Sequence, residues 1–186
     1  MHEHGLGGPV NLQEAAELYD AASELGDSDA MVSRALIYEA EGNLSAALEL
    51  YEKASKLGNP HAMVNMAPML LKGIDGRAPD PAAAIALYER AIELGNPDAM
   101  FNRAYMHEKG TGGPVNLPEA IRLYSNALKH ESCQKDTADA IQARLGALGA
   151  INHPIANTLA QTPVANSVHG GPGGAASGSS LTPERR

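Results

Sequence analysis

Histidine and glutamate side chains cluster at the first residues of the chain, where they could contribute to a metal site. His2, Glu3 and His4 are metal-ligating residue types, but a metal site needs more ligands than these, held in a closed geometry. The His2–Glu3 pair also recurs as His107–Glu108, within a segment that resembles the first residues of the chain. This recurrence favours a repeated structural pattern over a metal site, and we expect no bound metal.

One cysteine and two glycine-rich loops are the remaining candidates for chemistry. Cys133 follows His130 by three residues, but nothing else near it in the sequence would activate the thiol as a nucleophile. The loops GLGGP at 5–9 and GTGGP at 110–114 lack the Lys-Ser/Thr pair and the preceding strand of a phosphate-binding loop, so we expect turns. The sequence therefore predicts no catalytic residue, no cofactor and no enzymatic activity.

A repeat of 32 to 37 residues organises the chain. Residues 1–19 and 106–124 are identical at 14 of 19 positions, and both contain GGPVNL. One tyrosine marks each copy of the repeat, at Tyr19, Tyr51, Tyr88 and Tyr124. Self-similarity of this length is typical of solenoids, in which each unit packs only on its neighbours.

Each copy is predicted to be a pair of α-helices. Alanine, leucine and alanine lie four residues before, one before and three after each tyrosine, which gives one apolar stripe along a helix. Eight residues before each tyrosine stands a helix-capping residue, namely Asn11, Asn43, Asp80 or Asn116. A glycine closes most copies, and Asn59-Pro60 and Asn96-Pro97 then begin another helix.

The segment A-x-x-L-Y-x-x-A-x-x-x-G, after a loop such as G-T-G-G-P-V-N, resembles the Sel1-like repeat, a relative of the tetratricopeptide repeat. The resemblance covers roughly residues 1–150, although the usual tryptophan is leucine and the usual first-helix glycine is alanine, at Ala35, Ala67 and Ala104. It implies an all-α fold, a right-handed α-solenoid of antiparallel helix pairs. A tetratricopeptide array is the alternative, but its regular 34-residue period fits the spacing less well.

We expect the solenoid to consist of a partial first repeat, three repeats and a capping helix, at residues 1–29, about 30–61, 62–98, 99–133 and 136–149. Pro68 is expected to kink or end its helix, because proline deletes a hydrogen bond and clashes with the preceding turn. The Gly/Ser/Pro-rich tail at 151–186 has few residues that could fill a core and is predicted to be disordered. Because Met1 aligns with Met106, inside a first helix, we also expect the native chain to begin further upstream.

Charge and composition restrict the partners. A net charge of −8 and a pI near 5.3 oppose nucleic acid or an anionic membrane as the main partner. No run of 18 apolar residues is present, so we expect no membrane insertion. With Cys133 alone and no signal peptide after Met1, a reducing, cytoplasmic location is expected, provided that Met1 is the true start.

The predicted function is non-enzymatic: an adaptor or scaffold that binds a protein or peptide through the concave surface lined by first helices. The candidate binding residues are Met31, Arg34, Tyr38, Asn65, Met66, Phe101, Asn102, Arg103 and Met106. Arginine and aromatic residues are enriched at binding hot spots. Alternatively, Arg34, Arg103 and Arg144, which share one position of the repeat, form salt bridges between neighbouring units.

Two further expectations follow from the repeat and from the resemblance. The uncovered face of the first repeat is a second possible surface for association, because the end of a solenoid stays apolar unless it is capped. The resemblance implies proteins that assemble complexes. It also leaves one alternative function, the handling of β-lactams suggested for disulfide-rich members, whose paired cysteines this chain lacks.

Overall fold

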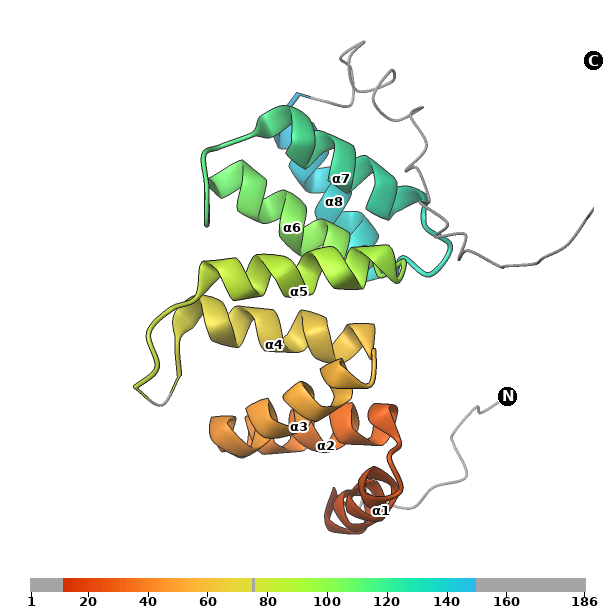
Figure 1. The fold of residues 1–186 in the computed structure, drawn as a ribbon. Coiled ribbons are helices and arrows are strands. Elements are labelled where there is room, and N and C mark those ends of the chain that lie inside the picture. Colours follow the sequence, from red (N-terminus) through yellow and green to blue (C-terminus); the bar gives the residue numbers. More distant parts are fainter. Residues whose placement is uncertain (1–11, 75, 150–186) are drawn as a thin grey trace, which may run out of the picture.

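The computed structural model describes residues 12–74 and 76–149, which form eight α-helices and no strand. The helices are α1 (Leu12–Glu24), α2 (Ser28–Ala40), α3 (Leu44–Lys56), α4 (Pro60–Lys72), α5 (Pro81–Glu93), α6 (Pro97–Lys109), α7 (Leu117–Lys129) and α8 (Lys135–Ala147). They are stacked in chain order, from α1 at one end to α7 and α8 at the other (Figure 1). We call α2, α4 and α6 first helices and α1, α3, α5 and α7 second helices, according to their place in the repeat.

Side-chain caps begin the helices at the predicted asparagine and aspartate residues. Asn59 Oδ1 accepts hydrogen bonds from the backbone N–H groups of His61 and Ala62, at 2.9 and 3.1 Å. The predicted caps Asn43, Asp80 and Asn116 make the corresponding bonds at α3, α5 and α7. Each bond satisfies a donor that has no partner within its own helix. Asn11 lies outside the described residues.

The second helices α3 and α5 end at glycines whose backbone is left-handed. Gly58 and Gly95 have φ angles of 89° and 78°, a region that glycine enters without the steric cost of a Cβ atom. At the first of them, the N–H of Gly58 bonds the carbonyl of Ser55 and the N–H of Asn59 bonds that of Ala54, both at 3.0 Å. These bonds satisfy the last carbonyls of α3 and turn the chain toward α4.

Three of the four tyrosines of the repeat lie in the core, whereas Tyr19 of α1 is partly exposed. Tyr51, Tyr88 and Tyr124 are at most 2% exposed, and the alanines around them are fully buried. Tyr51 donates a hydrogen bond to Glu39 of α2 at 2.7 Å. Tyr124 does the same to Glu108 of α6 at 3.0 Å. Small alanines let the helix axes approach closely, while each of these two hydroxyls keeps a polar partner.

Helices that follow each other along the chain pack together, most extensively as α2 with α3, α4 with α5, and α6 with α7. The next unit then packs on the second helix of the previous one, and α8 lies against both α6 and α7. The predicted all-α fold of stacked helix pairs is confirmed. Its last helix begins at Lys135, where the sequence predicted a helix over 136–149. The tail at 151–186 and the first residues of the partial repeat lie outside the described residues.

Hydrogen bonds also join the beginnings of α2 and α4, and those of α6 and α8. Asn59 Nδ2, at the start of α4, donates to Asp29 Oδ1 at 2.7 Å and to Ser28 Oγ at 3.1 Å, at the start of α2. Two units further on, Thr137 of α8 donates to Asp98 of α6 at 2.7 Å. Asp29 and Asp98 occupy the same position of the repeat. Polar contacts thus fix neighbouring units to each other, in addition to their apolar packing.

Pro68 does not end its helix, because α4 continues to Lys72. Of the two effects predicted for this proline, the early end of the helix is therefore wrong. The residues around Pro68 explain this result. Met63 and Ala67 before it are fully buried, and Met69 after it is 6% exposed. Core packing on both sides of the proline offsets the lost backbone hydrogen bond.

Within residues 12–74 and 76–149, no helix is long and apolar enough to cross a membrane.

Candidate protein-binding surface

A groove on the first helices is the best candidate for a binding site. It has a volume of about 310 Å³ and takes residues from three units, and we call it the first-helix groove. Its lining consists of Glu39 of α2, Leu44 of α3, five residues of α4, Ile74 after α4 and Asn102 of α6; the five are Val64, Asn65, Pro68, Met69 and Lys72. A ligand in it would contact several units at once.

The predicted residues Asn65 and Asn102 both line this groove, and they occupy the same position of the repeat in α4 and α6. Each side-chain amide carries both a donor and an acceptor, so it can pair with a peptide backbone. Burial and the hydrogen bond to Glu39 raise the pKa of Tyr51 well above its ordinary value, against a smaller opposing effect of Asn65. Glu39 is therefore held in place by a buried hydroxyl.

Charged and apolar side chains complete the groove. Lys72 is exposed at the end of α4, and Glu39 is half-buried. Leu44 is 36% exposed, while Met69 is 6% exposed and belongs to the core. A surface with apolar contacts, two amides and one charge of each sign suits an extended or helical peptide better than a small reactive substrate.

The structure corrects the prediction for Met31 and Met106. The two methionines are 6% and 3% exposed, and they belong to the hydrophobic core rather than to a binding surface. Both lie on the face of their first helix that packs against a second helix, because apolar residues that recur three or four positions apart form the buried stripe. Their exposure could not be judged without the neighbouring helices.

Arg34 and Arg103 are engaged in ion pairs between consecutive helices. Arg34 Nε lies 2.9 Å from Asp20 of α1, and Arg103 Nη2 lies 3.4 Å from Glu89 of α5. Desolvation by burial lowers the pKa of Arg34, but Asp20 and weaker interactions with other groups raise it, and the net shift is upward. The alternative that the sequence left open, salt bridges between neighbouring units, therefore describes both arginines.

The other three predicted residues are only partly accessible. Tyr38 lies under the guanidinium of Arg34, at 3.9 Å from its ring centroid. Met66 packs against the core cluster around Tyr51. Phe101 packs on Tyr124 with ring centroids 5.6 Å apart. None of the three lines the first-helix groove.

Arg144 belongs to a charge cluster at the last unit. Its Nη1 and the Nζ of Lys109 lie 3.1 and 2.7 Å from Glu108, whose side chain is 8% exposed. Burial alone would raise the pKa of Glu108, but hydrogen bonds from Lys109 and Tyr124 and the charge of Arg144 lower it overall. Tyr105 lies between the two cations, within 5.5 Å of each. This cluster fixes α6, α7 and α8 together.

The residues considered for catalysis do not come together as a reactive pair. Burial and nearby Asp98 raise the pKa of the Cys133 thiol, which makes it a poorer nucleophile at neutral pH. His130 Nδ1 lies 2.9 Å from Ser132 Oγ rather than from the sulfur. Among the described residues there is no group of three or more side chains that could hold a metal. His2, Glu3 and His4 lie outside this part of the chain.

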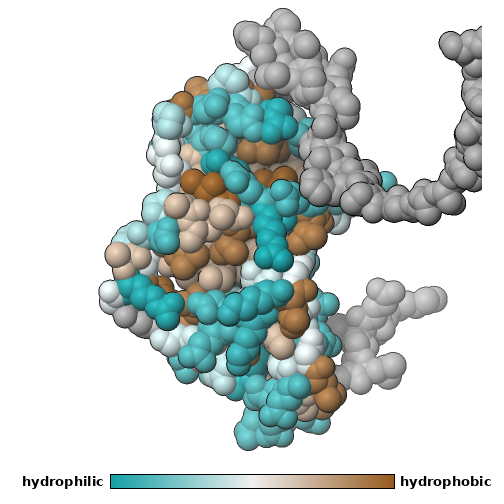
Figure 2. All heavy atoms as spheres, in the orientation of Figure 1, coloured by the Kyte–Doolittle hydropathy of each residue, from teal (hydrophilic) through white to brown (hydrophobic). Residues whose placement is uncertain are grey.

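Sequence reasoning did not predict Glu39, Lys72 or Ile74 as part of the groove. The repeat could have indicated Glu39, because Glu39 and Glu108 both stand nine residues after the alanine that opens a first helix. No recurring pattern in the sequence indicated Lys72 or Ile74, since they lie where a first helix ends and a loop of variable length begins. Figure 2 shows a group of hydrophobic side chains over the middle of the face in view, with hydrophilic side chains beside it.

Comparison with known families places repeats on most of this array. The Sel1 repeat model matches residues 60–96 and 97–131, and a tetratricopeptide repeat model matches residues 11–62. Proteins built from such repeats typically serve as scaffolds for protein interaction and are generally non-catalytic. None of the curated proteins matches the chain.

Two solved structures share the fold. The chain is similar to a Sel1 repeat protein from Oxalobacter formigenes, with 22% identity and a TM-score of 0.65 over 79% of this chain and 60% of the other. It is equally similar to a protective antigen of uropathogenic Escherichia coli strains that displays an SLR fold, with 22% identity and a TM-score of 0.65. That match covers 86% of this chain and 34% of the other. This chain therefore spans less than two thirds of either protein.

Proposed function

From the premise that this chain carries Sel1 and tetratricopeptide repeats in an SLR fold, we propose that it is an adaptor that binds a protein or peptide segment through the first-helix groove. The observation that carries the proposal is the pair of equivalent amides, Asn65 and Asn102, which line one groove from two consecutive first helices. Amides repeated at the spacing of the helices can pair with the repeating backbone of a bound segment.

The groove also provides orientation. Glu39 and Lys72 offer one negative and one positive group to the ligand. Leu44 and Ile74 add apolar contact area. Specificity then depends on where a ligand carries its complementary charges and its apolar side chain. Segments of different sequence can meet these requirements.

Peptides selected for binding to the full chain test the proposal. Random peptides displayed on phage are selected against the full chain, and the affinities of enriched peptides are measured for wild type and for Asn65→Ala plus Asn102→Ala. We expect the double variant to bind at least about tenfold more weakly. The matched control is Lys53→Ala plus Glu93→Ala, which changes two exposed residues on α3 and α5.

If Asn65→Ala plus Asn102→Ala bound the peptides as tightly as the control Lys53→Ala plus Glu93→Ala, and circular dichroism showed both to be folded, the binding site would lie elsewhere. The enzymatic alternative is tested separately, by measuring the hydrolysis of a chromogenic β-lactam. Turnover that scales with protein concentration would replace the adaptor proposal with an enzymatic one.

A further inference from the structure

We propose that the backbone carbonyl of Val64, which Pro68 leaves without its helical donor, accepts a hydrogen bond in the first-helix groove from a backbone N–H of an extended segment of a partner protein. Val64 and Pro68 both line this groove from the middle of α4. The inference rests on the proposed function and specifies how the same groove holds its ligand. It also gives a role to the proline inside α4, which the adaptor proposal does not use.

The carbonyl of Val64 has lost its ordinary donor. In an α-helix each carbonyl accepts a hydrogen bond from the N–H four residues later, and residue 68 is a proline, which carries no N–H. Within residues 12–74 and 76–149, no side chain donates to this carbonyl instead. Helix carbonyls point along the axis toward the following turn, so this oxygen lies between Val64 and Pro68. Both residues are half-buried and line the groove, where a ligand can reach them.

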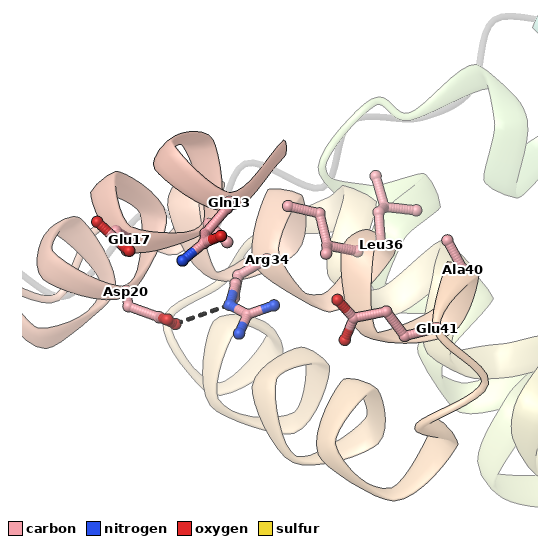
Figure 3. A pocket seen from close by; sticks show the side chains of 9 residues that line it. Gln13, Glu17, Asp20, Arg34, Leu36, Ala40 and Glu41 are labelled. Atoms are coloured by element: carbon pink, nitrogen blue, oxygen red, sulfur yellow. Dashed lines mark hydrogen bonds and ion pairs between the residues drawn. The ribbon is translucent and has the colours of Figure 1, made fainter. Parts of the chain in front are cut away.

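The first helices of the neighbouring units keep this donor. Leu36 of α2 and Tyr105 of α6 occupy the position of Pro68, directly after the alanine that the repeat shares. Figure 3 shows Leu36 on α2, one turn before Ala40. Each of these residues has a backbone N–H for the carbonyl of the preceding turn. Among α2, α4 and α6, only α4 therefore offers a backbone acceptor from the interior of its helix.

A free backbone acceptor favours an extended ligand over a helical one. A helical segment uses its N–H groups within its own helix, apart from those of the first turn. An extended segment instead has unpaired N–H and carbonyl groups along its length. Asn65 and Asn102 line the same groove and offer both donors and acceptors to such a backbone. The Val64 carbonyl thus adds a third polar contact of the kind that a bound strand requires.

The charges of the groove lie away from this carbonyl. Glu39 and Lys72 lie at the ends of α2 and α4, whereas Val64 lies in the interior of α4. A lysine or arginine of a ligand pairs more strongly with the Glu39 carboxylate than with a neutral carbonyl. In the loop after α4, the N–H of Asp80 bonds the carbonyl of Leu70 instead. The donor that meets Val64 is therefore a backbone N–H of the bound segment.

Pro68→Ala restores the missing N–H and tests the inference with the peptides selected against the full chain. It should bind them about three- to tenfold more weakly than wild type, because the regained N–H competes for the Val64 carbonyl. Its urea midpoint should be no lower than that of wild type, since alanine favours a helix interior far more than proline does. Pro68→Leu should behave alike, and it keeps an apolar side chain, as Leu36 does in α2. The matched control is Pro60→Ala, in the first turn of α4, where a proline frees no carbonyl.

Ester substitutions in the peptide identify the donor. Each replaces one backbone N–H by oxygen and leaves the side chains unchanged. At one position the ester should weaken binding to wild type about three- to tenfold, and should add little to Pro68→Ala, because both changes remove one contact. In wild type, the NMR resonance of the Val64 carbonyl carbon, observed through the N–H of Asn65, should move downfield when the peptide binds. Any competition from other residues of the full chain is included in these affinities.

Wild-type affinity of Pro68→Ala and Pro68→Leu, or an ester scan in which no position is coupled to Pro68, would overturn the inference. So would coupling to a lysine or arginine side chain of the peptide, or tighter binding of peptides stapled into a helix. None of these results removes the dependence of binding on Asn65 and Asn102, so the proposed function would stand. Failure to select any peptide that depends on the two amides would reject the proposed function, and this inference with it.

Discussion

Tyr51 donates a hydrogen bond of 2.7 Å to Glu39, across the pair formed by α3 and α2. The same relationship joins Tyr124 to Glu108 at 3.0 Å. Between these units, Tyr88 is equally buried, but the matching position of α4 holds Leu71 instead of a glutamate. Burial alone raises the pKa of Tyr88 to about 12. The array therefore contains two tyrosines bonded to a carboxylate and a third that serves as their internal comparison.

Tyr51→Phe should lower the free energy of unfolding by about 1.5–3 kcal/mol, because it removes a hydrogen bond to a charged group. Tyr88→Phe should lower it by less, since no carboxylate faces that hydroxyl at the equivalent position. Urea unfolding followed by circular dichroism measures both values. A larger loss for Tyr88→Phe would contradict the assignment of the hydroxyl contacts.

Glu108 should make stability depend on pH in the acidic range. Its folded-state pKa lies below the ordinary value of 4.5, so its contribution is present above that value and is lost as the pH falls through the lower, folded value. Glu108→Gln should therefore destabilise the protein at pH 7 but cost progressively less below about pH 4.5. Thermal unfolding of both proteins between pH 7 and pH 3 tests the sign. A difference that grows on acidification would refute it.

Gly73→Ala should be more destabilising than Gly58→Ala. Both glycines have a positive φ, so alanine costs about 1 kcal/mol at either place. A Cβ at Gly58 meets open space, whereas one at Gly73 would collide with the backbone carbonyl of Arg77. The additional loss at Gly73 is measured by urea unfolding. Equal losses would mean that the loop after α4 rearranges freely.

Ala91→Leu should destabilise the protein by about 1–3 kcal/mol, because Ala91 is fully buried and a larger side chain overpacks the helix pair. Ala82→Leu is the matched control, since Ala82 is exposed on the same helix, α5. Thermal unfolding of the two variants gives the comparison. Similar midpoints would show that the core near Ala91 tolerates added volume.

The sequence was sufficient to predict what depends on residues close together in the chain. The caps at Asn43, Asp80 and Asn116 and the stripe around each tyrosine are local patterns, and the structure has them at the expected places. The continuation of α4 past Pro68 could not be predicted, because it depends on packing by other helices. A local rule gives the cost of proline but not the burial that offsets it.

The lining of the proposed binding groove was predicted only in part, for a related reason. Asn65 and Asn102 were predicted as exposed residues of first helices, and they line one groove. Met31 and Met106 were predicted on the same ground but are buried, because which face of a helix is covered depends on its neighbours. The arginines were ambiguous in the sequence, because an exposed arginine and one paired with Asp20 or Glu89 have the same local pattern.

The contacts of Asn59 with Asp29 and of Thr137 with Asp98 have a consequence for the shape of the whole array. Each one sets the angle at which one unit meets the next, and such angles add up along a stack that touches only nearest neighbours. A small rotation at the junction near Asn59 would displace all later helices, and the displacement would grow with distance from the junction. The first-helix groove takes residues from α2, α4 and α6, so the angle between α2 and α4 also affects its width.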